Sequence, residues 1–379
     1  MTTSERARIS RRDIAGVFLK LGTIAFGGPA AHIAMMEEEV VVRRKWLTRQ
    51  QFLDYLGATN LIPGPNSTEL AIHIGHLCGG PAGLVIAGAC FILPAAIIVT
   101  AIAYLYVRFG QLPIAGGVLY TLKPVVIAIV VQALIRLSRT AIKSRMLAAT
   151  AAAAVVATAL GANELVVLIG GGLVAAAAVR PARPVAPAPL LLSPVVIASA
   201  TTTPASLLAI FALFAKTGAV LFGSGYVLLA FLRADFVDRL HWLTDRQLLD
   251  AIVVGQITPG PVFTTATFVG CVIAGWQGAV VATVGIFLPA FVFVAASGPL
   301  VPRLRRSPTA GAALDGVTVA SLALMAVVTW QLGRAALPDV VTWTIASISL
   351  LLLLRYRVNS AWLVGAALAV GLVITGWLR

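Results

Sequence analysis

Charged residues are scarce in this chain of 379 residues: they make up 11% of it, whereas 59% of its residues are hydrophobic. Charged residues are roughly a quarter of an ordinary soluble domain, so the composition excludes that class. Apolar runs recur along the chain, and a run of about 20 residues is long enough to cross ~30 Å of hydrocarbon. Because these runs show no alternation of polar and apolar residues, a β-barrel is excluded as well. The sequence therefore predicts an all-α polytopic membrane protein.

Cysteine is also rare, and the three cysteines form no CxxC or other paired spacing. A disulfide framework or a redox centre therefore finds no support. The chain contains no P-loop, zinc-protease or nucleophile-elbow pattern, which argues against ATP hydrolysis and hydrolase chemistry. We expect no catalytic residues, no metal site and no cofactor.

Basic residues outnumber acidic ones by 28 to 14, giving a formal net charge of +14. Most of the excess lies between the apolar runs, where basic residues orient membrane helices. Membrane topology therefore explains the charge, and no nucleic-acid partner is expected. The basic start Arg6–Arg12 precedes an apolar run without a small-residue cleavage site, which favours a retained first helix over a removed signal peptide.

The chain is an internal duplication. A shift of 196 positions aligns Phe18–Phe91 with the second half without a gap, and 21 of 74 positions are identical. Shared membrane composition does not explain the matches, which include Trp46-Leu47-Thr48 with Trp242-Leu243-Thr244 and Pro63-Gly64-Pro65 with Pro259-Gly260-Pro261. We predict two homologous halves, with a first repeat over residues 1–183, a Pro-rich connector over 184–206 and a second repeat over 207–379.

Each half contains a similar series of apolar runs. They are Ile14–Met36, Phe52–His73, Ala82–Val107, Ile114–Ile135 and a close pair within Met146–Val179, then Leu207–Leu232, Leu248–Gly270, Gly278–Val301, Gly311–Leu332, Val340–Leu354 and Ala361–Leu378. In each half the basic loops lie at the ends of alternate apolar runs, and the second half uses the opposite set of loops from the first. If basic loops are cytoplasmic, the second half is inserted upside down relative to the first, which predicts an inverted repeat. Only the mixed segment Arg43–Arg49 disagrees. Inversion needs an odd number of crossings per half, so one run is re-entrant or Leu190–Ala200 adds a short crossing.

Glycine and proline interrupt the apolar runs at equivalent places in both halves. Proline removes a backbone donor and glycine frees φ, and irregular backbone at membrane depth needs protein or a wet cavity around it. Paired breaks in two repeats indicate a midplane transport site, and the half-helix N-termini beyond them suit an anion. Packing kinks are the alternative. The expected binding residues are Gly27, Gly28, Pro29, Asn60, Pro63, Gly64, Pro65, Gly223, Ser224, Gly225, Gln256, Pro259, Gly260 and Pro261.

Lys20 and Lys216 lie within apolar stretches, six residues before a Phe-Gly pair in both halves. A cation inside a bilayer costs ~3 kcal/mol or more, so such a residue usually faces a cavity or a partner. Two ammonium groups near four half-helix ends would suit a dianion, and we expect both lysines to bind substrate. For Lys20, which lies near a helix start, snorkelling to the interface is the alternative.

The remaining titratable residues leave several alternatives open. Asp54 and Asp250 could pair with Arg43 and Arg239, or carry a coupling proton, and Glu39 is a further ion-pair or proton candidate. Lys123, before Pro124, is a candidate wall of a polar cavity.

Glu69, His73 and His76 share one helix face at i, i+4 and i+7. This spacing also occurs in metal sites, but proton handling, substrate lining or an interfacial position are the other interpretations. The second half has Thr265, Val269 and Val272 at these places, so this pattern of titratable residues occurs only in the first half.

These motifs together resemble the chromate transporter family in its long form of two fused halves. The residues that carry the resemblance are Phe26-Gly27-Gly28-Pro29, Glu39, Trp46–Thr48, Asn60–Pro65 and Phe91-Ile92-Leu93-Pro94, with Phe222–Gly225, Asp235, Trp242–Thr244, Gln256–Pro261 and Phe287-Leu288-Pro289. The resemblance implies an inner-membrane carrier that exports chromate and confers resistance, with sulfate as a similar oxyanion and with antiparallel halves. Ser224 and Gly225 depart from Gly28 and Pro29, so the two breaks need not contact substrate equally.

The sequence and the resemblance together predict chromate export by alternating access, driven by the membrane potential, a proton gradient or both. A dianion that leaves a cell with a negative interior gains roughly 4.6 kcal/mol per 100 mV. Two alternatives remain: a carrier of another small anion such as sulfate or a carboxylate, and an integral membrane protein that transports nothing. The expected partners are chromate, sulfate as its analogue and the lipid bilayer, and a homodimer stays open.

Overall fold

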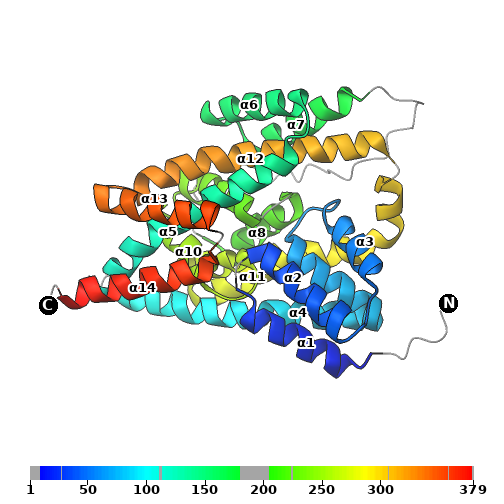
Figure 1. The fold of residues 1–379 in the computed structure, drawn as a ribbon, viewed down its shortest axis with the longest axis horizontal. Helices are drawn as coiled ribbons and strands as arrows, with labels where there is room; N and C mark the ends of the chain where they lie inside the picture. The colour runs from blue at the N-terminus through cyan, green and yellow to red at the C-terminus, as the bar shows by residue number, and fades with distance from the viewer. Residues whose placement is uncertain are drawn as a thin grey trace.

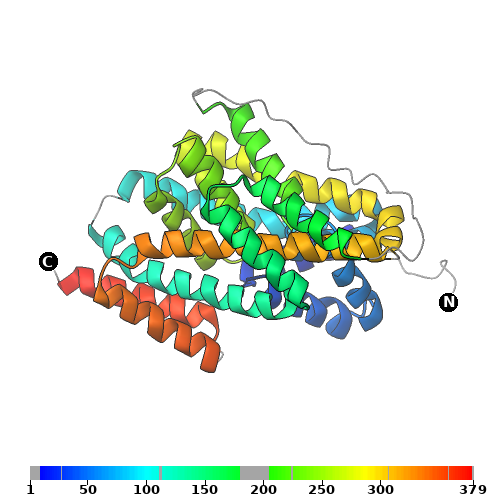
Figure 2. The ribbon, with the colours of Figure 1, turned by 90° about the horizontal axis from the view of Figure 1, so that it is seen from above.

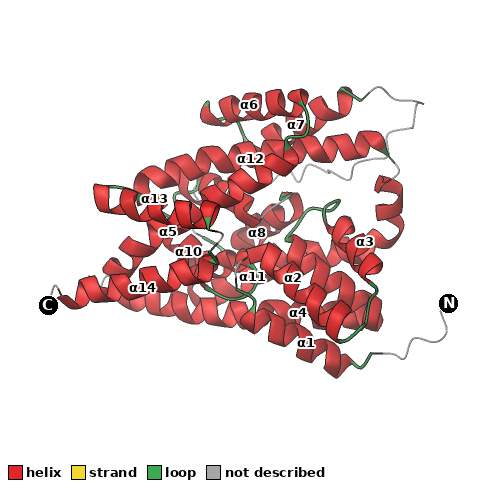
Figure 3. Cartoon of the chain, viewed as in Figure 1, coloured by secondary structure: helices red, strands yellow, loops and turns green. Residues whose placement is uncertain are grey.

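The computed structural model describes residues 9–26, 28–110, 113–179, 205–222, 225–305, 307–356 and 358–377. Within these ranges every regular element is a helix (Figure 3). The expected connector over 184–206 falls almost wholly outside the described residues, as do Gly27, Gly223 and Ser224.

The helices follow one another in the same order in both halves (Figure 1). They are α1 (Arg11–Ile24), α2 (Gly28–Glu37), α3 (Arg49–Thr59), α4 (Asn66–Phe109), α5 (Pro113–Ala141), α6 (Arg145–Ala159) and α7 (Glu164–Ala177), then α8 (Leu207–Val220), α9 (Leu228–Leu232), α10 (Asp245–Ile257), α11 (Thr265–Arg305), α12 (Pro308–Ala336), α13 (Val340–Arg355) and α14 (Ser360–Trp377). Short 3₁₀ and π turns complete them: η1 (Glu38–Arg43), η2 (Gly225–Val227), η3 (Arg233–Arg239) and η4 (Val262–Thr264).

The repeated Trp-Leu-Thr motif has a structural role. Thr48 and Thr244 are the N-caps of α3 and α10, and each forms a capping box with a glutamine three residues later, Gln51 or Gln247. Such a box satisfies two backbone donors that the start of a helix leaves free. The motif therefore fixes where α3 and α10 begin, at equivalent points of the two halves.

The two halves exchange their last helices. In the first half α1 packs against α4, and in the second half α8 packs against α11. The pair α6 and α7, however, packs against α12 of the second half, while α13 and α14 pack against α5 of the first. The close pair of short helices at the end of each half was expected from the sequence, but its placement on the opposite half was not.

Equivalent long helices run in opposite directions. Following the chain, α5 runs from left to right and α12 from right to left in two views at right angles (Figures 1 and 2). In a parallel repeat these two helices would point the same way. The inversion predicted from the loop charges is therefore confirmed.

The helices α4 and α11 are hairpins rather than straight rods. The backbone turns at Gly80 (φ 63°) and at Gly275 (φ 62°). The hydroxyl oxygens of Thr267 and Thr283 lie 2.7 Å apart, whereas sixteen residues of straight helix would separate them by ~24 Å. A Cβ on Gly75 would collide with the carbonyl oxygen of Gly83 in the opposite arm. Each hairpin thus joins a short re-entrant arm to a long second arm.

The positions of the two hairpins show that the gapless alignment of the halves needs one change. The Gly75–Gly83 crossing in α4 matches Gly270–Gly278 in α11, a shift of 195 rather than 196 positions. The two Pro-Gly-Pro motifs keep the shift of 196. One residue is therefore missing from the second half between Pro261 and Gly270. The equivalents of Glu69, His73 and His76 are Thr264, Phe268 and Cys271, and the expectation of Thr265, Val269 and Val272 was wrong.

Four helical segments of the described chain are long and apolar enough to cross a membrane: Asn66–Phe109, Gly116–Ala141, Val262–Ser297 and Pro308–Ala336. The first and third include the hairpin turns at Gly80 and Gly275. The helices α6, α7 and α8 have only 14 or 15 residues, which corresponds to ~21 Å and is shorter than the hydrocarbon layer. Of these three, only α8 belongs to an apolar run that the glycine and proline breaks interrupt, while α6 and α7 are the close pair expected within Met146–Val179.

Candidate anion site at the helix breaks

The helix breaks of the two halves are joined to each other by backbone hydrogen bonds. The N–H of Gly64 donates to the carbonyl oxygen of Leu221 at 2.7 Å, and the N–H of Gly260 donates to that of Ala25 at 2.9 Å. Ala25 and Leu221 are the equivalent residues at the C-terminal ends of α1 and α8. Each Pro-Gly-Pro segment therefore lies against the break of the opposite half, and all four breaks meet at one centre between the halves.

The central glycines of both Pro-Gly-Pro segments have backbones that other residues rarely adopt. Gly64 has φ +138° and Gly260 has φ +96°, and both angles are in the left-handed region. A Cβ on Gly260 would lie 2.8 Å from the Cβ of Ala95 and 3.1 Å from the carbonyl oxygen of Gly22. A Cβ on Gly64 would overlap the carboxyl of Glu69. Gly260 therefore requires glycine for space as well as for backbone angle, whereas at Gly64 the close contact is with the end of a side chain.

The first-half break contains buried polar groups that lack partners. Thr68 and Glu69 are fully buried in the first turns of α4, and His73 follows one turn later. The Thr68 hydroxyl, both Glu69 carboxyl oxygens and His73 Nε2 have no hydrogen-bond partner among the described residues. Ser67 differs, because its hydroxyl contacts Nδ1 of the buried His32 at 3.3 Å.

His32 also ties the first-half break to helix α2. Its Nε2 lies 3.1 Å from the carbonyl oxygen of Ala25, the same oxygen that accepts from Gly260 of the second half. Sequence reasoning missed His32, because a lone histidine in an apolar helix gives no pattern. Among the expected residues nearby, Asn60 donates to Leu56 at 3.2 Å and accepts from Asn66 at 2.9 Å.

The second-half break satisfies its polar groups internally. The hydroxyls of Thr264 and Thr265 donate to the carbonyl oxygens of Pro261 and Val262, both at 2.8 Å. The Thr258 hydroxyl likewise donates within its own helix, to Val254 at 2.7 Å. One buried donor remains without a partner there, Nε2 of Gln256. The two breaks are therefore alike in backbone and unlike in side chains.

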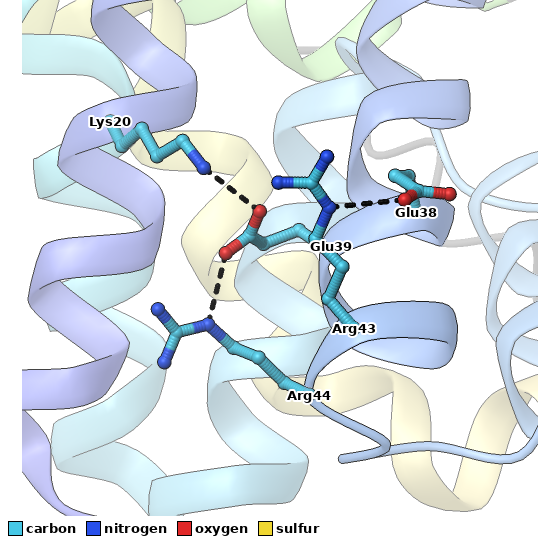
Figure 4. A network of polar contacts seen from close by, with 5 residues as sticks. All are labelled: Lys20, Glu38, Glu39, Arg43 and Arg44. Carbon is cyan, nitrogen blue, oxygen red and sulfur yellow. Dashed lines mark hydrogen bonds and ion pairs between the residues drawn. The ribbon is translucent and has the colours of Figure 1, made fainter.

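The two expected lysines are ion-paired. The Lys20 ammonium lies 3.0 Å from the carboxylate of Glu39, which also accepts from Arg44 at 3.0 Å (Figure 4). Lys20 donates to Glu39 and thereby lowers the pKa of that carboxyl, and Arg44 lowers the pKa further. Two cations share one carboxylate, so this group has a net charge of +1. The side chain of Lys20 is 45% exposed.

The second half repeats this arrangement at greater depth. Lys216 forms an ion pair with Asp235, and Arg239 contacts the other oxygen of Asp235 at 2.9 Å. Glu39 and Asp235 occupy equivalent places in the π-helical turns η1 and η3. The side chain of Lys216 is only 11% exposed. The two lysines thus occupy matched ion pairs with Glu39 and Asp235, and their expected role in binding substrate stays a prediction.

The two arginines expected to pair with Asp54 and Asp250 form ion pairs with other carboxylates. Arg43 pairs with Glu38 at 3.0 Å (Figure 4), and Arg239 pairs with Asp235. In the second half, pairing of Asp250 with Arg239 was therefore wrong, because Asp250 lies 2.7 Å from the ammonium of Lys123. Arg43 is likewise engaged elsewhere, and Asp54 accepts from Gln50 at 3.3 Å.

The Asp250 ion pair crosses between the halves. Asp250 belongs to α10, Lys123 to α5, and Tyr106 of α4 donates its hydroxyl to Asp250 at 2.8 Å. Lys123, expected as a polar wall, is thus a buried partner of the opposite half. Tyr106 carried no signal in the sequence, since an aromatic residue in an apolar helix is ordinary.

A cavity of ≈ 530 Å³ lies beside the second-half ion pairs. It is bounded by the turn between α6 and α7, by η3 and by α12, and its charged lining residues are Glu164, Arg233, Asp238 and Arg239. Arg233 is held by Asp238 at 2.7 Å and by Asp245 at 3.0 Å. The sequence could not indicate this cavity, because its walls come from three distant segments.

Comparison with known proteins identifies a family whose model matches both halves of the chain. The family model described as "Chromate transporter" matches residues 12–177 and again residues 208–372. The chromate transport protein of Cupriavidus metallidurans is 31% identical over 373 residues, covering 96% of this chain and 92% of that protein. A probable chromate transport protein of Synechococcus elongatus is also 31% identical, covering 96% and 93%. An uncharacterized transporter of Methanocaldococcus jannaschii is 26% identical and covers 98% of both. No solved structure matches the chain.

Proposed function

The chain belongs to the chromate transporter family, and from that premise we propose that it exports chromate across the inner membrane and so confers chromate resistance. The observation that carries the proposal is the pair of backbone bonds between the breaks, Gly64 to Leu221 and Gly260 to Ala25. They support a single central site shared by both halves. A dianion gains roughly 4.6 kcal/mol per 100 mV on leaving a negative interior, so export needs no nucleotide.

Alternating access would use the inverted halves as the moving parts, the first over residues 1–183 and the second over 207–379. In the described conformation the N–H groups of Gly64 and Gly260 are engaged with the opposite half. When the halves separate on one side, these backbone donors become free for an anion. The cycle then exchanges hydrogen bonds between protein groups for hydrogen bonds to the anion, first on one side and then on the other.

The ion-paired groups would supply the charge that a dianion needs. Lys20 and Arg44 share Glu39, and Lys216 and Arg239 share Asp235, so each group has one positive charge in excess. Two such groups balance a dianion without leaving a free cation in the empty carrier. The anion is moved without chemical conversion. Sulfate, a dianion of the same shape, is the natural competitor.

The test is uptake of radiolabelled chromate into everted inner-membrane vesicles that contain the protein. We expect time-dependent uptake that falls when the membrane potential is collapsed with an ionophore, and vesicles without the protein serve as the control. Collapsing the pH gradient separately shows whether protons contribute. Excess sulfate tests selectivity. Chromate uptake equal to that of the control vesicles would contradict the proposed function.

A further inference from the structure

Four buried polar atoms that have no partner in the described part of the chain lie within two turns of the first arm of α4. They are the Thr68 hydroxyl, the two Glu69 carboxyl oxygens and His73 Nε2. Most buried polar groups in proteins have a hydrogen-bond partner, so a cluster of exceptions needs an explanation. Here the cluster stands at the start of a half-helix directly after Pro63-Gly64-Pro65. The Glu69 carboxyl points at Gly64, at the meeting point of the breaks.

The Glu69 carboxyl meets no cation. Neither of its oxygens has a hydrogen-bond partner among the described residues, and its Oε1 lies against Gly64, whose other close neighbour is the Ala290 methyl of α11. The titratable side chains near this arm are His73 and His76 on the same helix, His32 of α2 through Ser67, and Tyr55 of α3 against the His73 ring. A lone buried carboxylate is far more costly than a neutral acid. Glu69 is therefore held as a neutral acid whose O–H can donate.

The ligand that suits this cluster is rich in acceptors. A neutral acid and a hydroxyl each carry a proton to donate, and a histidine nitrogen can do the same. A tetrahedral oxyanion offers four oxygen acceptors, whereas a metal cation would need the acid ionised. We propose that Glu69 is a substrate-binding residue that donates, as a neutral acid, a hydrogen bond to the transported oxyanion, with Thr68 and His73 beside it. This inference rests on the proposed function and names the subsite.

The subsite belongs to the first half alone. The residues equivalent to Glu69 and His73 are Thr264 and Phe268, and the Thr264 hydroxyl is already used by Pro261. The second half can therefore offer mainly backbone donors, while the first adds side chains. It follows that ionisation of Glu69 repels the dianion and closes the subsite, so transport weakens as the pH rises.

Three substitutions in purified protein reconstituted into liposomes test the role of the acid. Glu69→Gln keeps a donor and removes the charge, so we expect chromate KM within about twofold of the wild type and a KM that no longer rises at alkaline pH. Glu69→Leu removes the donor, so we expect KM to rise about tenfold at every pH. Glu37→Gln is the matched control, since Glu37 pairs with Arg49 away from the breaks; it should keep the wild-type pH profile.

The outcomes separate this inference from the proposed function. Wild-type liposomes without chromate flux would overturn the proposed function itself. Wild-type flux together with unchanged KM in Glu69→Leu, or with an alkaline rise of KM that persists in Glu69→Gln, would overturn only the role of Glu69. Sulfate binding by calorimetry at two pH values gives a second reading. If Glu69→Leu does not fold, the pH profile of Glu69→Gln still decides.

Discussion

The helix breaks of the two halves share their backbone and differ in their side chains. Gly64 and Gly260 make the same bond to the opposite half, with the same kind of left-handed backbone. Around Gly260 the threonine hydroxyls are used within the chain, whereas around Gly64 the polar atoms of Thr68 and Glu69 are left without partners. The duplication gives the two breaks the same backbone geometry. The difference in their side chains indicates which half holds the side chains that bind the substrate.

The largest effect is expected from removing the two symmetric cations together. Lys20→Met with Lys216→Met takes away the excess charge of both ion-paired groups, and we expect chromate transport to fall to background while the protein still inserts. Of the single variants, Lys216→Met should be the more damaging, because Lys216 is 11% exposed and Lys20 is 45% exposed, and exposed pairs contribute little.

Vesicle uptake and the amount of membrane-inserted protein are the two measurements for the lysine variants. Normal efflux in the double variant would show that the lysines lie outside the transport path. Equal losses in the two single variants would show that burial does not set their importance.

The two glycines test the shared backbone. Gly260→Ala places a methyl group against Ala95 and the backbone of Gly22, which cannot move, so we expect loss of transport and a lower thermal unfolding midpoint. Gly64→Ala meets only the flexible end of Glu69. Both carry a left-handed φ penalty of ~1–2 kcal/mol.

A second, compensating substitution distinguishes the packing around the two glycines. Adding Glu69→Ala should restore part of the unfolding midpoint to Gly64→Ala, whereas trimming Ala95 would still leave the new methyl of Gly260→Ala against the carbonyl oxygen of Gly22 at 3.1 Å. Equal midpoints for Gly64→Ala with and without the second substitution would contradict the packing around Gly64.

The pair of Lys123 and Asp250 exists on one side of the repeat only. The equivalent of Lys123 is Thr318, whose hydroxyl bonds to Leu314 within α12. Asp250→Asn leaves the Lys123 ammonium buried without its carboxylate, and we expect a loss of about 3–5 kcal/mol in stability. Adding Lys123→Met should recover most of it.

Thr318→Val is the matched control for this ion pair and should change stability little. Denaturation in detergent, followed by tryptophan fluorescence, measures all of these variants. A double variant no more stable than Asp250→Asn alone would show that the ion pair is not what Asp250 contributes.

The sequence predicted the helical architecture of this fold better than the contacts between its side chains. Helix breaks, inversion and paired lysines follow from local patterns, namely glycine and proline positions, loop charge and matched residues. The hairpin turn at Gly80 and the one-residue shift after Pro261 were missed, because a single deletion in an apolar stretch leaves no compositional trace. Glu39 was expected as an ion-pair candidate without a named partner, and the partner of Asp250 was wrong, since pairing depends on which helices meet, and α5 meets α10 of the other half.

The smallest effect compares two buried threonines next to the Pro-Gly-Pro segments, Thr264 and Thr68. The Thr264 hydroxyl donates to Pro261 at 2.8 Å, so Thr264→Val should lower the free energy of unfolding by about 1 kcal/mol and leave chromate KM unchanged. The Thr68 hydroxyl has no partner among the described residues, so Thr68→Val should cost no stability and raise KM by about threefold. Paired measurements of unfolding and of uptake kinetics decide it. The reverse pattern, with KM moving in Thr264→Val and not in Thr68→Val, would place the side-chain donors in the second half and reverse the assignment of the halves.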